Sequence, residues 1–274
     1  PPMPRPRTVN DAALAVTGHL TSIPVAQGRR VLADATFSGG SLHLGTLHAQ
    51  LPATPLETNL DANVRGDGHW DIARFGWRDP QALAFEASGE LDPSAVAPLL
   101  ALSVRVDRAL CPLVTQRYAR DLLAAQGLSK LALKGELAAE FALNEQGLQR
   151  VAITTPALDV DDGAGLVAFT GLRGGIDWAA NGERPSTNLA WKAGRLENVA
   201  LSAASSRWQS KGGALRLLGS LRTKLIGGTL ALSDTTLYPL SKQGERARSR
   251  FALDGIGYDS KDGTIAAAKV KANG

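Results

Sequence analysis

Residues 129–144 read SKLALKGELAAEFALN, and this stretch decides the fold because its apolar and polar side chains alternate. From Leu131 onward every odd-numbered position is apolar or glycine, whereas Lys134, Glu136 and Glu140 stand at even-numbered positions. Successive side chains of a β-strand point to opposite faces of its sheet. The stretch therefore predicts a strand with one apolar face and one solvated face.

The same alternation recurs along much of the chain. Further predicted strands lie at 60–64, 83–91, 189–193, 199–203, 215–221 and 251–253. Short segments rich in Gly, Asn and Asp separate the strands, and these residues favour tight hairpin turns. Such turn signals stand at 39–40, 66–68, 144–147, 162–163, 181–182, 211–213, 227–228 and 262–263.

Short turns between strands predict a mainly β fold, a long antiparallel meander. Sheet twist would curl such a meander into an open, U-shaped sheet with the apolar side chains inside. A closed β-sandwich, in which two apolar faces meet, requires the same alternation. The sequence leaves these two arrangements open.

One region departs from the two-residue period. From Asp107 to Gly127 the apolar residues recur every three or four positions, which predicts an amphipathic helix. A shorter helix is predicted from Asp92 to about Leu102. These helices either cover sheet surface or plug an apolar groove. The predicted organisation is an N-terminal meander at 1–92, a helical insertion at 93–128 and a C-terminal meander at 129–274, forming one elongated segment of a longer protein.

Composition excludes several classes of protein. The chain has 274 residues, of which 44% are hydrophobic, and a single cysteine, which excludes a disulfide scaffold within the chain. No stretch approaches the roughly 20 apolar residues of a membrane span. The net charge is only +4, and no basic stripe with exposed aromatics indicates nucleic-acid binding. The basic residues Arg246, Arg248 and Arg250 form either a solvated loop or a contact for an anionic head group.

Residues that carry chemistry are scarce. Of the four histidines, His43 and His48 are five positions apart, so one regular strand would point them to opposite faces. Cys111 stands at the start of the predicted helix, where a helix dipole lowers a thiol pKa, but no partner for it is visible. No nucleotide-binding, zinc or nucleophile motif is present. We therefore expect no enzyme, no metal and no cofactor; a pocket that holds Cys111 beside a histidine would reverse this.

Two phrases of the sequence resemble a known group of bacterial proteins. The first is RYARDLL at 117–123, which continues as GLSKLALKGEL at 127–137. The second is KGGALRL at 211–217, followed by LIGGTLALS at 225–233. In these phrases, and most closely over residues 107–240, the chain is similar to the AsmA-like, YdbH and TamB group of envelope proteins.

The resemblance implies a periplasmic, β-rich protein that an N-terminal helix anchors to the inner membrane in its full-length form. It further implies a U-shaped sheet with an apolar trough that helps move phospholipid towards the outer membrane, without catalytic residues. This sequence shows no such anchor, as expected of a segment.

The expected function is a non-enzymatic conduit that shields acyl chains during lipid transport between the inner and outer membranes. Each methylene exposed to water costs about 0.8 kcal/mol, so an apolar trough lowers the barrier without any chemistry. The expected partners are phospholipid or another acyl-chain lipid, together with proteins of either membrane. The expected lining residues are Leu83, Phe85, Leu91, Leu131, Leu133, Leu137, Phe141, Leu143, Leu215 and Leu217. The alternative is a structural module of the cell envelope that docks through exposed edge strands.

Overall fold

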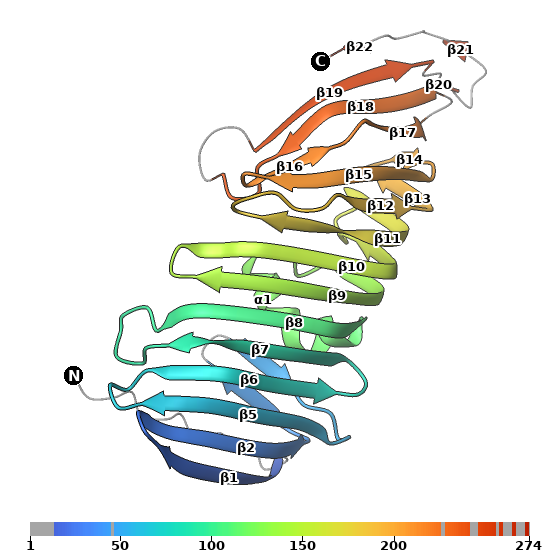
Figure 1. Ribbon diagram of the computed structural model, residues 1–274. Coiled ribbons are helices and arrows are strands. Elements are labelled where there is room, and N and C mark those ends of the chain that lie inside the picture. The colour runs from blue at the N-terminus through green and yellow to red at the C-terminus, as the bar shows by residue number, and fades with distance from the viewer. Residues whose placement is uncertain are drawn as a thin grey trace. The chain divides into compact units, whose positions relative to one another are not determined.

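The structure is a computed structural model that describes residues 14–44, 47–225, 228–241 and 246–255, and the backbone of three short strands beyond them (Figure 1). The chain divides into two compact units. Unit 1 comprises 1–100 and 109–129, and unit 2 comprises 101–108 and 130–274. Strand β8 (Leu99–Cys111) contributes residues to both.

Unit 1 is built on five antiparallel strands in the order β1–β2–β5–β6–β7. A separate hairpin, β3–β4, follows β2 in the chain. The bounds are β1 (Ala15–Val25), β2 (Gly28–Ser38), β3 (Ser41–Leu44), β4 (Leu47–Gln50), β5 (Leu56–Arg65), β6 (Trp70–Asp79) and β7 (Leu83–Leu91). The turns predicted at 39–40 and 66–68 lie between strands, as expected.

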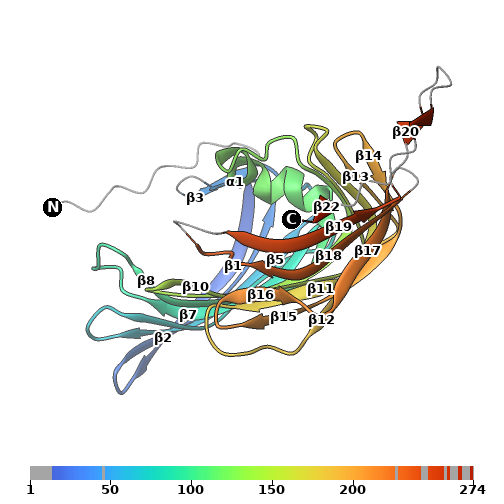
Figure 2. The ribbon, with the colours of Figure 1, turned by 90° about the horizontal axis from the view of Figure 1, so that it is seen from above.

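The helical part of unit 1 is shorter than predicted. It consists of the π-helical turn η1 (Thr115–Ala119) and the helix α1 (Arg120–Ala125), the latter labelled in Figure 2. Both contact the β4 strand. The chain leaves α1 at Gly127, whose φ of 75° suits a residue without a side chain. The helix end was thus predicted correctly, but its start was not.

Two helix predictions are wrong. Residues 107–111 belong to strand β8 although the adjacent charges Asp107 and Arg108 interrupt its alternation, and Leu110 N donates to Ala82 O at 2.8 Å. No helix begins at Asp92 either. The Asp92 carboxylate accepts hydrogen bonds from the backbone N and the hydroxyl of Ser94, which holds a turn instead.

Unit 2 is a second antiparallel meander, in which β9 pairs with β10 and β10 with β11. Beyond β11 three long strands are each broken in the middle, so that β12 and β13, β14 and β15, and β16 and β17 are halves of single strands. Strands β18 and β19 complete the meander. The bounds are β9 (Ala132–Asn144), β10 (Gly147–Asp161), β11 (Val167–Ala179), β12 (Thr187–Trp191), β13 (Ala193–Leu196), β14 (Val199–Leu201), β15 (Ala204–Lys211), β16 (Ala214–Leu217), β17 (Ser220–Leu225), β18 (Gly228–Leu237), β19 (Ala247–Asp254), β20 (Tyr258–Asp259), β21 (Ile265–Ala266) and β22 (Ala272–Asn273).

The breaks in these strands have a common anchor. Trp191 is 7% exposed, its Nε1 donates to Ser202 O at 3.0 Å, and its ring meets that of Phe169 edge-on at 5.2 Å. The Thr223 hydroxyl donates to the same carbonyl at 2.9 Å. The carbonyl of Ser202, which lies between β14 and β15, therefore keeps its hydrogen bonds although the strand is interrupted there.

The predicted fold class is confirmed, because the described chain is mainly β and its strands form an antiparallel meander. Buried side chains are few. In the described residues of unit 1 they gather near the helical segment and comprise Leu51, Leu56, Ala82, Ala109 and Cys111, with Ala62 further along the sheet. In unit 2 the largest are Leu158, Trp178, Trp191, Leu201, Leu215 and Leu217. The U-shaped curvature stays a prediction.

Candidate functional site: the apolar sheet face

The strand register of unit 1 collects apolar side chains on one side of the sheet. Ala33 lies opposite Leu60, Leu60 opposite Phe75, and Phe75 opposite Ala87. Opposite residues of an antiparallel pair share a face. We call this side the unit 1 apolar face; besides those four residues it comprises Val31, Ala35, Phe37, Leu56, Ala62, Val64, Trp70, Ile72, Trp77, Leu83, Phe85 and Leu91.

This face is accessible to solvent. Of its residues only Leu56 and Ala62 are buried, and all the others are partly exposed. The inward residues of a closed sandwich interdigitate with a second sheet and lose their exposure. The unit 1 apolar face therefore differs from a sandwich core, and the predicted lining residues Leu83, Phe85 and Leu91 lie on it.

Aromatic rings form the centre of this face. Trp77 stacks on Phe37 at 6.1 Å and on Phe85 at 6.5 Å between ring centroids, and Phe85 also approaches Phe75 at 5.9 Å. The rings come from β2, β6 and β7, so their contacts join strands that are not all adjacent. Side-by-side rings present a wide, rigid apolar surface with few rotatable bonds. Of this group only Phe85 was among the predicted lining residues.

A buried carboxylate fixes the helical segment to the same face. Asp79, whose side chain is 0% exposed, follows Trp77 by two positions and so points to the apolar side. Its Oδ2 accepts hydrogen bonds from Arg117 Nη1 at 2.8 Å and from the Tyr118 hydroxyl at 2.7 Å, and its Oδ1 accepts one from Gln81 N at 2.9 Å. The Tyr118 ring also meets Trp77 edge-on at 6.0 Å. Burial, and then the bond to Asp79, raise the pKa of Tyr118 well above its usual value.

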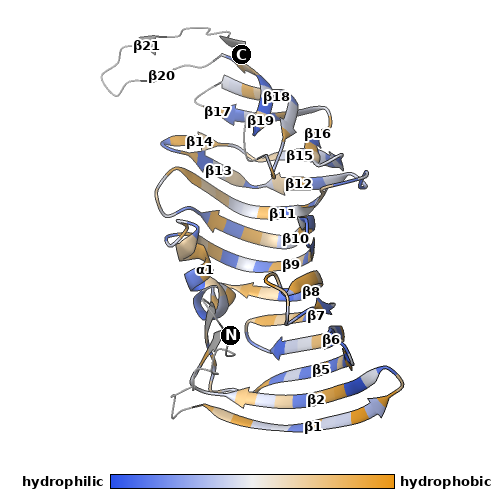
Figure 3. Ribbon diagram, turned by 90° about the vertical axis from the view of Figure 1, so that its left-hand side faces the viewer, coloured by the Kyte–Doolittle hydropathy of each residue, from blue (hydrophilic) through white to orange (hydrophobic). Residues whose placement is uncertain are grey.

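The opposite side of the unit 1 sheet carries its charges in pairs. Arg30 binds Asp61 through two hydrogen bonds of 2.9 and 2.7 Å, and Arg65 binds Asp71 in the same way at 2.7 and 2.6 Å. Arg74 pairs with Glu86. The hydrogen bond from Arg30 lowers the pKa of Asp61. The sheet is therefore segregated into a mainly apolar side and a side that carries these ion pairs, and alternating bands are visible along its strands (Figure 3).

Unit 2 has an apolar face of its own. Phe141 lies opposite Val151, which lies opposite Trp178, and Ala139 lies opposite Ile153, which lies opposite Ile176. The predicted lining residues of β9 continue this face, and each is partly exposed: Leu133, Leu137, Phe141 and Leu143, together with Leu131 just before the strand.

Two predicted lining residues do not fit an accessible surface. Leu215 and Leu217 are only 6% and 7% exposed. They lie on β16, where Leu215 is opposite Ser210 and Leu217 opposite Trp208 of β15. Trp178 of β11 contacts this β15–β16 hairpin, because its Nε1 donates a hydrogen bond to Gly213 O at 2.8 Å. In this structure both leucines are core residues, because the hairpin packs onto the end of β11.

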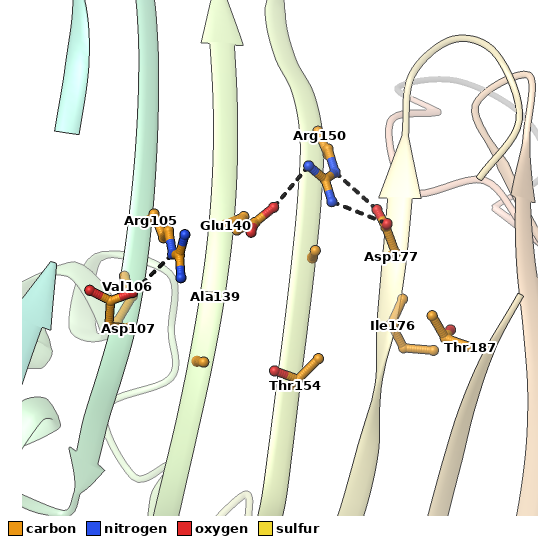
Figure 4. A pocket seen from close by; sticks show the side chains of 12 residues that line it. Arg105, Val106, Asp107, Ala139, Glu140, Arg150, Thr154, Ile176, Asp177 and Thr187 are labelled. Atoms are coloured by element: carbon orange, nitrogen blue, oxygen red, sulfur yellow. Dashed lines mark hydrogen bonds and ion pairs between the residues drawn. The ribbon is translucent and has the colours of Figure 1, made fainter. Parts of the chain in front are cut away.

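The polar side of unit 2 contains a shallow hollow of about 330 Å³ over β8, β9, β10 and β11 (Figure 4). Arg150 bridges Glu140 at 2.8 Å and Asp177 at 3.1 Å, while Arg184 binds Asp177 at 2.9 Å. Burial opposes ionisation of Asp177, but the hydrogen bonds from the two arginines outweigh it and lower its pKa. Arg105 pairs with Asp107 at 2.9 Å. The charges that line the hollow thus neutralise one another, and the cluster holds neighbouring strands together.

Cys111, His43 and His48, the residues considered for catalysis or metal binding, lie in other secondary-structure elements than predicted. Cys111 ends strand β8 instead of starting a helix, and burial raises its pKa. His43 and His48 lie opposite each other in the register of the β3–β4 hairpin rather than along one strand, and their side chains lie outside the described residues. Within the described residues no group of three His, Cys, Asp or Glu could hold a metal ion.

The remaining sequence features are placed as follows. Arg248 and Arg250 lie on the exposed strand β19 rather than in a loop, and Arg250 pairs with Asp234 at 2.9 Å. In the part of the chain that the structure describes, no helix has the length and apolar character needed to cross a bilayer. The turn predicted at 262–263 lies outside the described residues.

Comparison with known proteins adds no relative: no protein-family model, curated protein or solved structure matches this chain.

Proposed function

We propose that the protein is a non-enzymatic lipid-binding segment whose apolar sheet faces shield the acyl chains of phospholipid or a similar lipid. In this proposal it acts in the periplasm as part of a conduit between the inner and outer membranes, and an anchor in the full-length protein holds it at the inner membrane. The location and the conduit rest on the resemblance to the AsmA-like group. Acyl binding rests on the exposed apolar faces.

The observation that carries the proposal is the partial exposure of the unit 1 apolar face. Its residues lie on β2, β5, β6 and β7, and Val16 and Leu20 of β1 lie on the same side, so five strands separated by four steps of about 4.8 Å give a width of roughly 19 Å. One leaflet of a bilayer core is about 15 Å deep, half of the roughly 30 Å hydrocarbon thickness. An extended acyl chain laid across these strands therefore stays on apolar side chains along its length.

The chemistry of the face suits a hydrocarbon tail better than a polar ligand. The aromatic group of Phe37, Trp77 and Phe85 offers dispersion contacts, and each methylene removed from water contributes about 0.8 kcal/mol. Arg30, Arg65 and Arg74, which could attract a phosphate, lie on the other side in ion pairs. Binding through the tail leaves the head group in solvent.

Photocrosslinking tests this proposal directly. The protein is mixed with vesicles of phosphatidylethanolamine and phosphatidylglycerol that contain a fatty acid with a photoreactive group on its tail. We expect crosslinks on residues of the unit 1 apolar face, such as Phe75 and Phe85. Leu60→Glu places a charge at the centre of that face and should lower the yield at least five-fold.

The matched control is Asn63→Glu, which adds the same charge to the same strand on the opposite side of the sheet. Its yield should equal that of the wild type, and circular dichroism should show the same strand content for both variants. Equal yields for the two variants, or crosslinks spread evenly over both sides of the sheet, would refute acyl binding by this face.

A further inference from the structure

Strands β15–β19 of unit 2 carry an excess of positive charge. Together they contain seven lysines and arginines but only two aspartates, a net charge of +5, whereas the whole chain carries +4. All seven basic residues are exposed. The positive charge of the protein is therefore concentrated on these neighbouring strands (Figure 1).

The strand register places the basic residues on one side of the sheet. Gln209 of β15 lies opposite Arg216 of β16, and Arg207 shares this side because it stands two positions before Gln209. Thr236 of β18 lies opposite both Arg216 and Arg248 of β19. The side chains of Arg207, Arg216 and Arg248 thus point the same way from three strands.

The same side continues along the strands. Arg250 stands two positions further along β19, and Ser233 lies opposite both Arg250 and Ser220 of β17. Arg222 and Lys224 follow Ser220 at two-residue steps. We call this side of β15–β19 the basic face; the other side of these strands carries no Lys, Arg, Asp or Glu.

Only part of this charge is neutralised by ion pairs. On β15, Lys211 pairs with Glu183 at 2.9 Å, and Arg250 pairs with Asp234 at 2.9 Å. Four other residues of the basic face form no ion pair with any described residue, and they are Arg207, Arg216, Arg222 and Lys224. The hollow over β8–β11 differs, because its arginines are paired with carboxylates.

We propose that the basic face docks the protein onto the surface of a bilayer that contains anionic phospholipid. A guanidinium group without a carboxylate partner binds phosphate through parallel hydrogen bonds and breaks no ion pair to do so. Basic residues spread over several strands match a plane of many anionic head groups. The inference goes beyond the proposed acyl binding, because it rests on the charged side of unit 2 and not on the unit 1 apolar face.

The positions of the aromatic residues favour a bilayer over a nucleic acid. Proteins that bind single strands stack the bases on aromatic side chains next to a basic groove. Trp208 and Phe251 are the aromatic residues of β15–β19, and each stands next to an arginine in its strand. Their side chains therefore lie on the other side of the sheet, and the basic face offers charges without stacking surfaces.

Co-sedimentation with vesicles measures the docking. We expect the wild-type protein to bind vesicles of phosphatidylcholine and phosphatidylglycerol, but not vesicles of phosphatidylcholine alone. Raising the salt concentration from about 0.1 M to about 1 M shortens the Debye length from about 10 Å to about 3 Å and should remove most of the binding. Each basic residue near an anionic bilayer raises the affinity about five-fold, so Arg207→Gln, Arg216→Gln and Arg222→Gln combined should weaken binding about a hundred-fold.

The matched control removes three positive charges elsewhere. Arg78, Arg120 and Lys130 are exposed and form no ion pair with the described residues. Arg78→Gln, Arg120→Gln and Lys130→Gln combined give the same net charge as the first variant and should weaken binding by less than about two-fold. Leu60→Glu, which disrupts acyl binding under the proposed function, should dock like the wild type, so the two proposals fail separately.

Three results would overturn the proposal. A wild-type protein that leaves anionic vesicles unbound, or binds phosphatidylcholine vesicles equally well, would show that the basic face does not dock on anionic head groups. Equal losses in the two triple variants would mean that net charge alone governs binding. Tighter binding to a DNA duplex of random sequence, per mole of phosphate, would assign the basic face to nucleic acid.

Discussion

Replacing Asp79 by asparagine should destabilise unit 1 more than any exposed ion pair can. The carboxylate is fully buried, and its Oδ2 accepts two hydrogen bonds, from Arg117 and Tyr118. Asparagine keeps one oxygen, which can still accept from Gln81 N, but it turns the second acceptor into an NH₂ donor. That donor faces the guanidinium of Arg117, so the arginine loses its buried partner.

The magnitude follows from the burial of both groups. Removing one partner of a buried ion pair costs about 3–5 kcal/mol, because the remaining charge stays desolvated. Arg117 is 18% exposed and recovers some hydration, so we expect about 3 kcal/mol for Asp79→Asn. Asp61→Asn breaks the exposed pair with Arg30 and should cost far less, because solvent screens both charges.

Urea unfolding followed by tryptophan fluorescence measures both changes, and hydrogen exchange of residues 113–127 locates the effect. The contact of Tyr118 with Trp77 links the fluorescence to the helical segment. Asp79→Leu combined with Arg117→Met removes both charges and should recover most of the loss. A cost below about 1 kcal/mol for Asp79→Asn would refute the assignment of Asp79 as the anchor of this segment.

Three further outcomes are expected. Gly175→Ala should cost about 1–3 kcal/mol in urea unfolding, because the new Cβ would lie 2.2 Å from a carbonyl oxygen of the neighbouring strand, whereas Gly66→Ala meets nothing within 4 Å and should change stability by less than about 0.5 kcal/mol. Leu215→Ala should cost about 2–5 kcal/mol, and an equal cost for the half-exposed Leu196→Ala would contradict its core position. Because the folded-state pKa of Asp177 lies below the ordinary value of 3.8, its ion pairs stabilise the fold above pH 3.8, and this stabilisation is lost as the pH falls through the folded-state pKa. Asp177→Asn should therefore be less stable than wild type at neutral pH and indistinguishable from it in acid.

Local alternation was sufficient to predict the strands because the pleat is a local property. The apolar phase of 83–91 and of 131–143 is visible without knowledge of any partner strand, and β7 and β9 lie where it indicates. Turn residues between these runs then limit the topology to neighbouring antiparallel pairs. The fold class follows from these two signals alone.

The helix boundary could not be predicted in the same way. Leu110, Leu113 and Val114 have helical spacing, and the adjacent charges Asp107 and Arg108 interrupt the alternation of β8, yet residues 107–111 remain in that strand. A hydrogen bond from Leu110 to Ala82, 28 residues earlier, belongs to the strand arrangement. Periodicity contains no information about such a distant partner, so the two patterns could not be ranked from sequence.

The anchor of the helical segment was missed for a related reason. Asp79 stands in the apolar phase of its strand, two positions after Trp77, and an acid in that phase signals a buried partner. The partners are Arg117 and Tyr118, 38 and 39 residues further along. From the sequence, Tyr118 belonged to the predicted amphipathic helix and to the phrase RYARDLL, and no partner for it was visible.

Whether the apolar side of a strand is exposed to solvent depends on tertiary packing. Two sets of leucines, which stand in strands with the same apolar/polar alternation, differ in this exposure. Leu83 and Leu133 are partly exposed, while Leu215 and Leu217 are buried beneath their own hairpin contacts. Alternation states which side of a strand is apolar, and only packing states whether anything covers that side. Eight of the ten predicted lining residues remain partly exposed. Among the described residues no second sheet packs over them as it would in a sandwich.

This incomplete coverage links the stability of the protein to whatever occupies its apolar faces. Leu56 is the only large apolar side chain among the described residues that is less than 2% exposed, so much of the hydrophobic free energy available to these strands is unused. An acyl ligand that binds only the folded state adds RT ln(1 + [L]/Kd), about 2.7 kcal/mol at a hundred-fold excess over Kd. Under the proposed function, lipid should therefore raise the melting temperature of the wild type more than that of Leu60→Glu, whose charge lies at the centre of the unit 1 apolar face. Lipid that stabilises wild type and Leu60→Glu equally would instead mean that it binds elsewhere.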